Sequence, residues 1–182
     1  MASVRDAVLA RRSAPKVTDA APDDATIIGL LAAAERVPDH AALRPWRVIA
    51  LRGSARSRLG AALAEASGLS GDAAAKLAAK PERAPLLLAI VAAGTPHPKV
   101  PEWEQDAAAA GVAHLLGLLL DDAGWGVMWR TGPYTRHPLV AAMHGLGPNE
   151  HLLGWLYVGG VPESTRAPRV ARPLAPNFSS LD

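Results

Sequence analysis

The chain has 182 residues, of which 49% are hydrophobic and 20% are charged, and its formal net charge is +2. This length suits one domain spanning residues 1–182, and the composition excludes an intrinsically disordered chain. The absence of Cys excludes disulfides, thiolate catalysis and zinc–sulfur sites.

Charge and hydropathy also argue against nucleic-acid and membrane partners. A nucleic-acid binder would usually concentrate its basic residues in one stripe. Here the arginines are scattered along the sequence, at Arg5, Arg36, Arg83, Arg130 and Arg166. The N-terminus has no apolar core of signal-peptide length. The most apolar stretch, 107–120, is shorter than the roughly 20 residues that a membrane span needs. We therefore expect a cytoplasmic protein.

Two helices and a strand are predicted first. Ser3 begins a capping-box pattern with an Asp three residues later, which predicts a short helix that ends near Arg12. Apolar residues recur at helical spacing after Pro22, and Pro38 should end this second helix. The side chains of residues 46–52 alternate in character along the chain and include β-branched ones, a pattern that predicts a strand.

The middle of the chain predicts two helices and a buried strand. Residues 56–66 are amphipathic, and residues 72–80 form a further helical pattern. Residues 86–93 (LLLAIVAA) are a continuous apolar run, as expected for a central strand. Residues 95–101 hold three prolines and should form an ordered loop.

Residues 103–123 form the longest helical pattern. This segment is apolar on nearly all sides after its first turn and predicts a buried central helix, capped by Gly124. A short strand at 127–129, a helix at 138–144 and a strand at 152–159 follow. Together these elements predict a mixed α+β fold around a long central helix.

The chain from about residue 162 is rich in proline and is expected to be an extended tail without a core of its own. Such a tail often reaches across a partner subunit.

Arg11, Arg12 and Ser13 form the first candidate binding cluster. Two guanidiniums and a hydroxyl in a row can hold a phosphate by charge-assisted and bidentate hydrogen bonds. Alternatively, the positive charge only stabilises the C-terminus of the preceding helix.

A second cluster follows the second predicted helix. His40, Arg44 and Trp46 offer an imidazole, a guanidinium and a large ring. With the first cluster, they suit a ligand that carries a phosphate at one end and a flat heterocycle at the other, such as a flavin or a nucleotide. Alternatively, Arg36, His40 and Arg44 are solvated surface residues, an interpretation that for His40 is equal to a ligand role, and we expect Trp46 in the core.

A glycine-rich segment at 124–133 is the third candidate. Glycines let the backbone approach a ligand and expose N–H donors. Trp129, Arg130 and Thr131 place a ring, a guanidinium and a hydroxyl beside them. The alternative is a glycine-rich turn with packed tryptophans, which we favour for Trp125.

Other catalytic motifs are missing from the sequence. It has no G-x-S-x-G elbow, no P-loop and no dinucleotide fingerprint, and its six His residues do not fall at metal-ligand spacing. We expect neither a metal nor a catalytic side chain, so a cofactor must carry any chemistry.

Five pieces occur in order over roughly residues 4–162: Arg11-Arg12-Ser13, AERVPDH at 34–40, Arg44-Pro45-Trp46, KVPEWEQ at 99–105 and GVMWRTG at 126–132. This ordered set resembles the nitroreductase family of flavoproteins. It is most similar to the short branch of NAD(P)H nitroreductases.

The resemblance implies an α+β homodimer with a central antiparallel sheet flanked by helices and with FMN at the subunit interface. One subunit would contact FMN through Arg11, Arg12, Ser13, Trp129, Arg130 and Thr131. The other subunit would contribute Arg36 and His40. NAD(P)H would bind at Leu119, Leu120, Asp121, Asp122, Ala123 and Gly124.

The implied activity is ping-pong hydride transfer from NAD(P)H through FMN to nitroaromatics, quinones or similar acceptors. Two positions depart from the family: Pro15 replaces a basic residue that many members direct at the flavin, and Arg44 replaces a frequent Gln. Residues 94–101 and 68–80 are expected to form the acceptor pocket. A flavin-binding protein with little turnover (a carrier, sensor or degrader) and a colourless interaction module are the alternatives.

Overall fold

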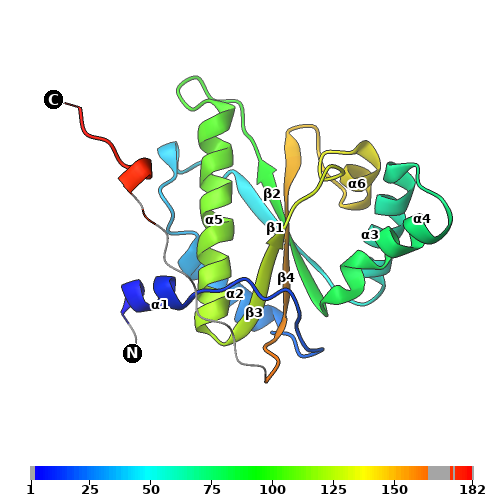
Figure 1. Ribbon diagram of the computed structural model, residues 1–182. Coiled ribbons are helices and arrows are strands. Elements are labelled where there is room, and N and C mark those ends of the chain that lie inside the picture. Colours follow the sequence, from blue (N-terminus) through cyan, green and yellow to red (C-terminus); the bar gives the residue numbers. More distant parts are fainter. Residues whose placement is uncertain (1–2, 164–172, 174, 182) are drawn as a thin grey trace.

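The computed structural model describes residues 3–163, 173 and 175–181, and its centre is a four-stranded antiparallel sheet. The strand order is β1-β2-β4-β3, so that β2 and β4 are central and β3 is an edge strand (Figure 1). The strands are β1 (Trp46–Leu51), β2 (Leu86–Ala93), β3 (Trp125–Arg130) and β4 (Glu150–Gly160).

Helices cover both faces of the sheet (Figure 1). One face carries α2 (Asp24–Ala34) and the long α5 (Glu102–Asp122), with α1 (Val4–Ala10) against α5. The other face carries α3 (Ser54–Ser67), α4 (Gly71–Ala78) and α6 (Pro138–Met143). Short 3-10 turns lie at η1 (His40–Ala42), η2 (Lys80–Arg83) and η3 (Ala175–Asn177). The expected α+β architecture is confirmed.

Strand β2 is buried along almost its whole length because both faces of the sheet are covered. Leu86, Leu88 and Ile90 belong to the core beneath α5, whereas Leu87 and Val91 belong to the core beneath α3. Burial on both faces explains why this strand reads as an apolar run instead of an alternating pattern.

Most predicted elements are confirmed to within a few residues, but the two last strands are longer than predicted. The strand predicted at 127–129 spans Trp125–Arg130, and the one predicted at 152–159 spans Glu150–Gly160. Glycines that were read as a turn belong to the ladder, since Gly126 pairs with Gly159. The second helix ends at Ala34, before the predicted stop at Pro38.

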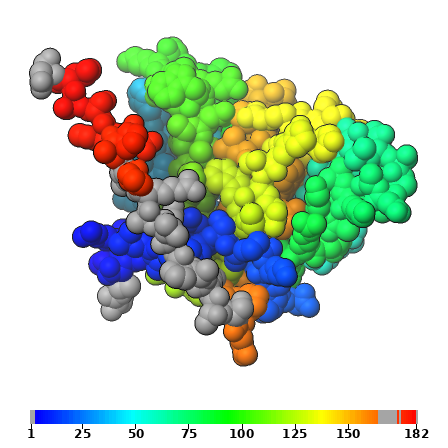
Figure 2. Space-filling view, in the orientation of Figure 1, coloured from blue at the N-terminus to red at the C-terminus, as the bar shows by residue number. Residues whose placement is uncertain are grey.

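The segment after α1 lies along the edge strand β3 and is held there by backbone hydrogen bonds. Ala14 N donates to Val127 O at 2.8 Å, and Thr18 N donates to Gly160 O at 2.8 Å. A Cβ on Gly126 would lie 2.9 Å from a methyl of Val17, so glycine is needed for this close approach. Figure 2 shows this blue segment crossing the front of the molecule. It brings Arg11 and Ser13 to the junction of α5 and β3.

Helix α5 buries the side that faces the sheet and exposes an apolar stripe on its other side. Trp103 is 68% exposed and Leu115 is 36% exposed. Within the described residues, no helix is long and apolar enough to cross a membrane. The extended tail predicted from about residue 162 falls largely on 164–172, which lie outside the described residues.

An ion pair ties β1 to β4 and predicts a pH-dependent stability. Arg47 donates two hydrogen bonds to the Glu150 carboxylate, at 2.6 and 2.8 Å. These bonds hold the pKa of Glu150 at about 2, although burial opposes them. Because this pKa lies below the ordinary value of 4.5, the stabilisation is complete above pH 4.5 and is lost as the pH falls towards 2.

We expect Glu150→Gln to lower the free energy of unfolding at pH 7 by about 1–2 kcal/mol, a value reduced for solvent screening of the partly exposed Arg47. The deficit should shrink steadily below pH 4.5 in urea denaturation. Glu65→Gln, which removes an exposed carboxylate on α3, is the control. A deficit that is the same at pH 3 and pH 7 would contradict the prediction.

Candidate functional site

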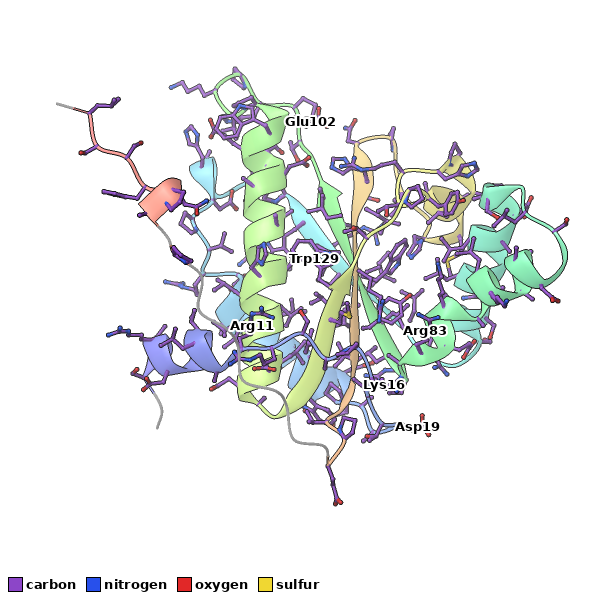
Figure 3. All side chains as sticks on the ribbon, viewed as in Figure 1. Arg11, Lys16, Asp19, Arg83, Glu102 and Trp129 are labelled. Atoms are coloured by element: carbon purple, nitrogen blue, oxygen red, sulfur yellow. The ribbon has the colours of Figure 1, made fainter. Side chains whose placement is uncertain are left out.

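A hollow of about 230 Å³ lies where the N-terminal segment, α5 and β3 meet. Arg11 and Ser13 line it from the segment after α1, His114 and Gly117 from α5, and Trp129 from β3. Arg11 and Trp129 both lie on the α5 side of the sheet (Figure 3). The structure therefore brings together two residues of the first predicted cluster and one residue of the glycine-rich cluster. We call this space the α5 hollow.

The Trp129 ring is held in place at the floor of this hollow. Its Nε1 donates a hydrogen bond to Leu153 O at 3.3 Å. The His114 ring meets it edge-on, with ring centroids 4.9 Å apart. A fixed, half-buried ring of this kind can border a flat ligand without reorganising.

Arg12 behaves differently from its neighbours in the first cluster. Its Nη1 donates to the carbonyl oxygens of Leu9, Ala10 and Arg11, at 2.7, 3.1 and 2.9 Å. These acceptors are at the C-terminus of α1, where a cation is favourable. The helix-end alternative thus describes the contacts of Arg12, whereas Arg11 and Ser13 face the α5 hollow.

Arg130 projects to the opposite face of the sheet from Trp129, as consecutive strand residues do. Its guanidinium lies 5.2 Å from the centre of the Tyr157 ring, and its Nη2 donates to Pro15 O at 3.5 Å. Its Nε is buried and has no hydrogen-bond partner among the described residues. Burial raises the pKa of Tyr157, against the opposing effect of Arg130 and Arg83.

Arg130 and Thr131 border a second space, of about 600 Å³, on the α3–α4 side of the sheet; we call it the α4 cavity. Leu69, Leu77 and Lys80 line it as well, so part of the expected acceptor loop at 68–80 does reach the glycine-rich segment. The other expected acceptor loop, 94–101, instead borders a separate space with Asn149 and His151.

Neither Arg36 nor His40 lines the α5 hollow of its own chain. His40 Nδ1 hydrogen-bonds to the Glu104 carboxylate at 2.8 Å. With Trp103, Gly111 and Leu115, His40 borders an open groove of about 650 Å³ along the exposed stripe of α5. His114 lines both this groove and the α5 hollow, so the two spaces are neighbours.

The stretch predicted to bind NAD(P)H is the C-terminal end of α5. The Leu120 side chain is fully buried in the core, and Leu119 packs against that core. Asp122, Ala123 and Gly124 are exposed, and Gly124 has a φ of 85°, which suits the predicted helix cap. The exposed end of the stretch is therefore its most accessible part.

Among the residues of these spaces that were not identified from the sequence are Arg83, His114 and Gly117. Arg83 comes just before the buried strand β2, but nothing local to that position indicates a partner on β3. His114 and Gly117 stand in an apolar helix, where neither residue suggests a ligand.

The chain also resembles known proteins. The model of the family described as "Nitroreductase family" matches residues 8–160. The chain is 33% identical over 152 residues to "Putative NAD(P)H nitroreductase YdjA" of Escherichia coli strain K12. The aligned region covers 82% of this chain and 83% of that protein.

Solved structures share the fold. A nitroreductase-like family protein from Bacillus cereus has a TM-score of 0.85 at 22% identity, over 100% of this chain and 97% of that one. The FMN- and NADPH-dependent nitroreductase NfnB from Sphigopyxis sp. strain HMH has a TM-score of 0.74 at 20% identity, over 100% of both chains.

Proposed function

Because this chain belongs to the nitroreductase family, it is an FMN-dependent oxidoreductase of the NAD(P)H nitroreductase type, and we propose that it reduces nitroaromatic, quinone or similar acceptors. The observation that carries the proposal is the α5 hollow, which Arg11, Ser13 and Trp129 line together. A guanidinium, a hydroxyl and a flat ring around one space match a phosphate joined to a heterocycle.

The residues around the α5 hollow fit FMN. Arg11 and Ser13 would hold the phosphate, and Trp129 would border the ring system. Thr131 lines the α4 cavity instead and would reach the cofactor only from the end of β3. A Cβ on Gly117 would meet no atom within 4 Å, so this part of α5 leaves open space for a ligand. When bound, FMN supplies two-electron transfer between NAD(P)H and the acceptor.

Arg12 and Arg130 would add positive charge around the cofactor without lining the α5 hollow. We infer that Arg12 acts on the phosphate from its position at the end of α1, where three carbonyl oxygens hold it. Arg130 contacts the carbonyl of Pro15, the position where many family members carry a basic residue. A guanidinium thus lies next to Pro15 and can provide the missing charge.

The second copy of this chain is the partner that we propose for the exposed stripe of α5. Trp103 and Leu115 leave this stripe apolar, and the groove beside it holds His40. Because His114 joins this groove to the α5 hollow, a second copy seated on α5 would bring its own Arg36 and His40 towards the first copy's FMN. We propose a homodimer with two such shared sites, each copy being one domain. A cytoplasmic location stays a prediction.

The exposed end of α5, at Asp122, Ala123 and Gly124, is the place that we propose for NAD(P)H. For a nitro acceptor, one NAD(P)H and one proton would yield the nitroso product, NAD(P)⁺ and water. This exchange moves one hydride and one proton onto the nitro group and releases one of its oxygen atoms.

The proposal predicts ping-pong kinetics, because NAD(P)⁺ would leave before the acceptor enters. Initial rates measured against NAD(P)H at several fixed acceptor concentrations should give parallel double-reciprocal lines. The acceptors to test are a nitroaromatic and a quinone. Lines that intersect would contradict this order of events, since both substrates would then occupy the site together.

A further inference from the structure

The loop that carries His40, between α2 and β1, has a strained backbone. Three of its residues other than glycine have a positive φ: Ala41 at 64°, Ala42 at 52° and Arg44 at 47°. A residue with a Cβ rarely adopts this conformation, which persists only where surrounding contacts impose it. The Asp39 carboxylate provides such contacts, since it accepts hydrogen bonds from Leu43 N at 3.3 Å and from Arg44 N at 2.7 Å. Backbone strain of this kind gathers at functional sites.

The His40 ring is held from outside this loop by Glu104 of α5. The distance between His40 Nδ1 and Glu104 Oε2 is 2.8 Å. A carboxylate can only accept a hydrogen bond, so Nδ1 of the neutral imidazole carries the proton and Nε2 carries the lone pair. Within the described residues, the ring makes no other hydrogen bond. Glu104 therefore sets both the orientation of the ring and the atom that the ring offers to a ligand.

The His40 ring lies on the surface that we propose for the second copy. Its side chain is 55% exposed, and it borders the groove along the exposed stripe of α5 together with Trp103 and His114. The Glu104 side chain is only 28% exposed. A partly buried carboxylate thus anchors an exposed imidazole, as expected where the imidazole contacts a ligand and the carboxylate orients it.

We propose that Glu104 is a positioning residue for the FMN site of the second copy: it holds the His40 ring so that Nε2 accepts a hydrogen bond from FMN. This inference rests on the proposed function, because it requires the shared site described there. Glu104 itself would not touch FMN. The competing role is that Glu104 only stabilises the first turn of α5, where a carboxylate is favourable beside the helix N-terminus. The two roles predict different results once His40 is removed.

The test is a double-mutant cycle on the Kd of FMN, measured by fluorescence titration of the FMN-free protein. We expect Glu104→Ala to raise the Kd by about three- to tenfold and His40→Ala to raise it at least as much. Adding Glu104→Ala to His40→Ala should have no further effect, because Glu104 acts only through His40. Glu104→Gln should keep most of the wild-type affinity, since its amide oxygen can still accept from Nδ1.

Glu102→Gln is the matched control, because Glu102 is an exposed carboxylate in the same first turn of α5 (Figure 3). It should leave the Kd unchanged. An equal loss in Glu102→Gln, losses that add in the double variant, or a loss in Glu104→Gln as large as in Glu104→Ala would assign Glu104 to the stability of α5 and overturn the proposal. Sedimentation velocity should show that Glu104→Ala remains as dimeric as the wild-type protein. Dissociation of this variant alone would assign Glu104 to the dimer contact and also overturn the proposal.

The same titrations separate this inference from the proposed function. If His40→Ala leaves the Kd of FMN unchanged, the shared site itself is wrong and the role of Glu104 falls with it. If His40→Ala weakens FMN binding but Glu104→Ala does not, the shared site stands and only the positioning role is overturned.

Discussion

Arg11→Ala is expected to raise the Kd of FMN by about 10–100-fold. A hydrogen bond to a charged group contributes about 1.5–3 kcal/mol, and Arg11 is the guanidinium that faces the α5 hollow. The measurement is a fluorescence titration of the FMN-free protein. Arg5→Ala removes the same charge from the exposed surface of α1 and should leave the Kd unchanged.

Gly117→Leu tests the same hollow by filling it. A leucine there would project into the open space that Gly117 borders, so FMN binding should fall. The helix should become more stable by up to about 1 kcal/mol, because Leu is a better helix former than Gly. Gly29→Leu, in open space on α2, should give the stability gain without the binding loss. Unchanged FMN affinity in Arg11→Ala and Gly117→Leu would refute this site.

Leu115→Asp is expected to dissociate the proposed homodimer, raising its dissociation constant by about 100-fold or more. The change removes an apolar contact and would bury a carboxylate in its place. Because each FMN site would draw Arg36 and His40 from the second copy, FMN affinity should fall together with dimerisation. Sedimentation velocity, with detection of flavin absorbance, follows both quantities in one experiment.

Leu139→Asp is the control for this prediction. Leu139 is 37% exposed and Leu115 is 36% exposed, but Leu139 lies on α6, on the other side of the sheet. It should leave both dimer and flavin unchanged. A wild-type protein that sediments as a flavin-loaded monomer would contradict the shared site.

Elements whose pattern is local were predictable from the sequence. The capping box at Ser3 and Asp6 is present, and the apolar run became the buried strand β2 with the predicted bounds. The edge strand β3 was underestimated because Trp125 and Gly126 lie in a segment of turn-forming composition. Only its pairing with β4 places them in the ladder.

The sequence motifs that make up the candidate site were recognisable, but their arrangement in space was not. The order of motifs indicated the family, yet the sequence could not tell that Arg12 would turn back onto α1 while Arg11 faced the α5 hollow. The two side chains differ only in the direction that the backbone gives them after the helix ends. Lys80 and Arg83 are about fifty residues from Arg130 in sequence, and only the packing of η2 and α4 near β3 brings them to one cavity.

The measurement that tests the central claim most directly is an anaerobic spectrum of the purified protein. We predict a yellow protein with flavin absorbance that NADH or NADPH bleaches in the absence of oxygen. Adding a nitroaromatic should then restore the colour. One molecule of acceptor should be reduced to the nitroso product for each reduced flavin that is reoxidised. A yellow protein that neither nucleotide bleaches would contradict the account and leave a flavin-binding protein with little turnover.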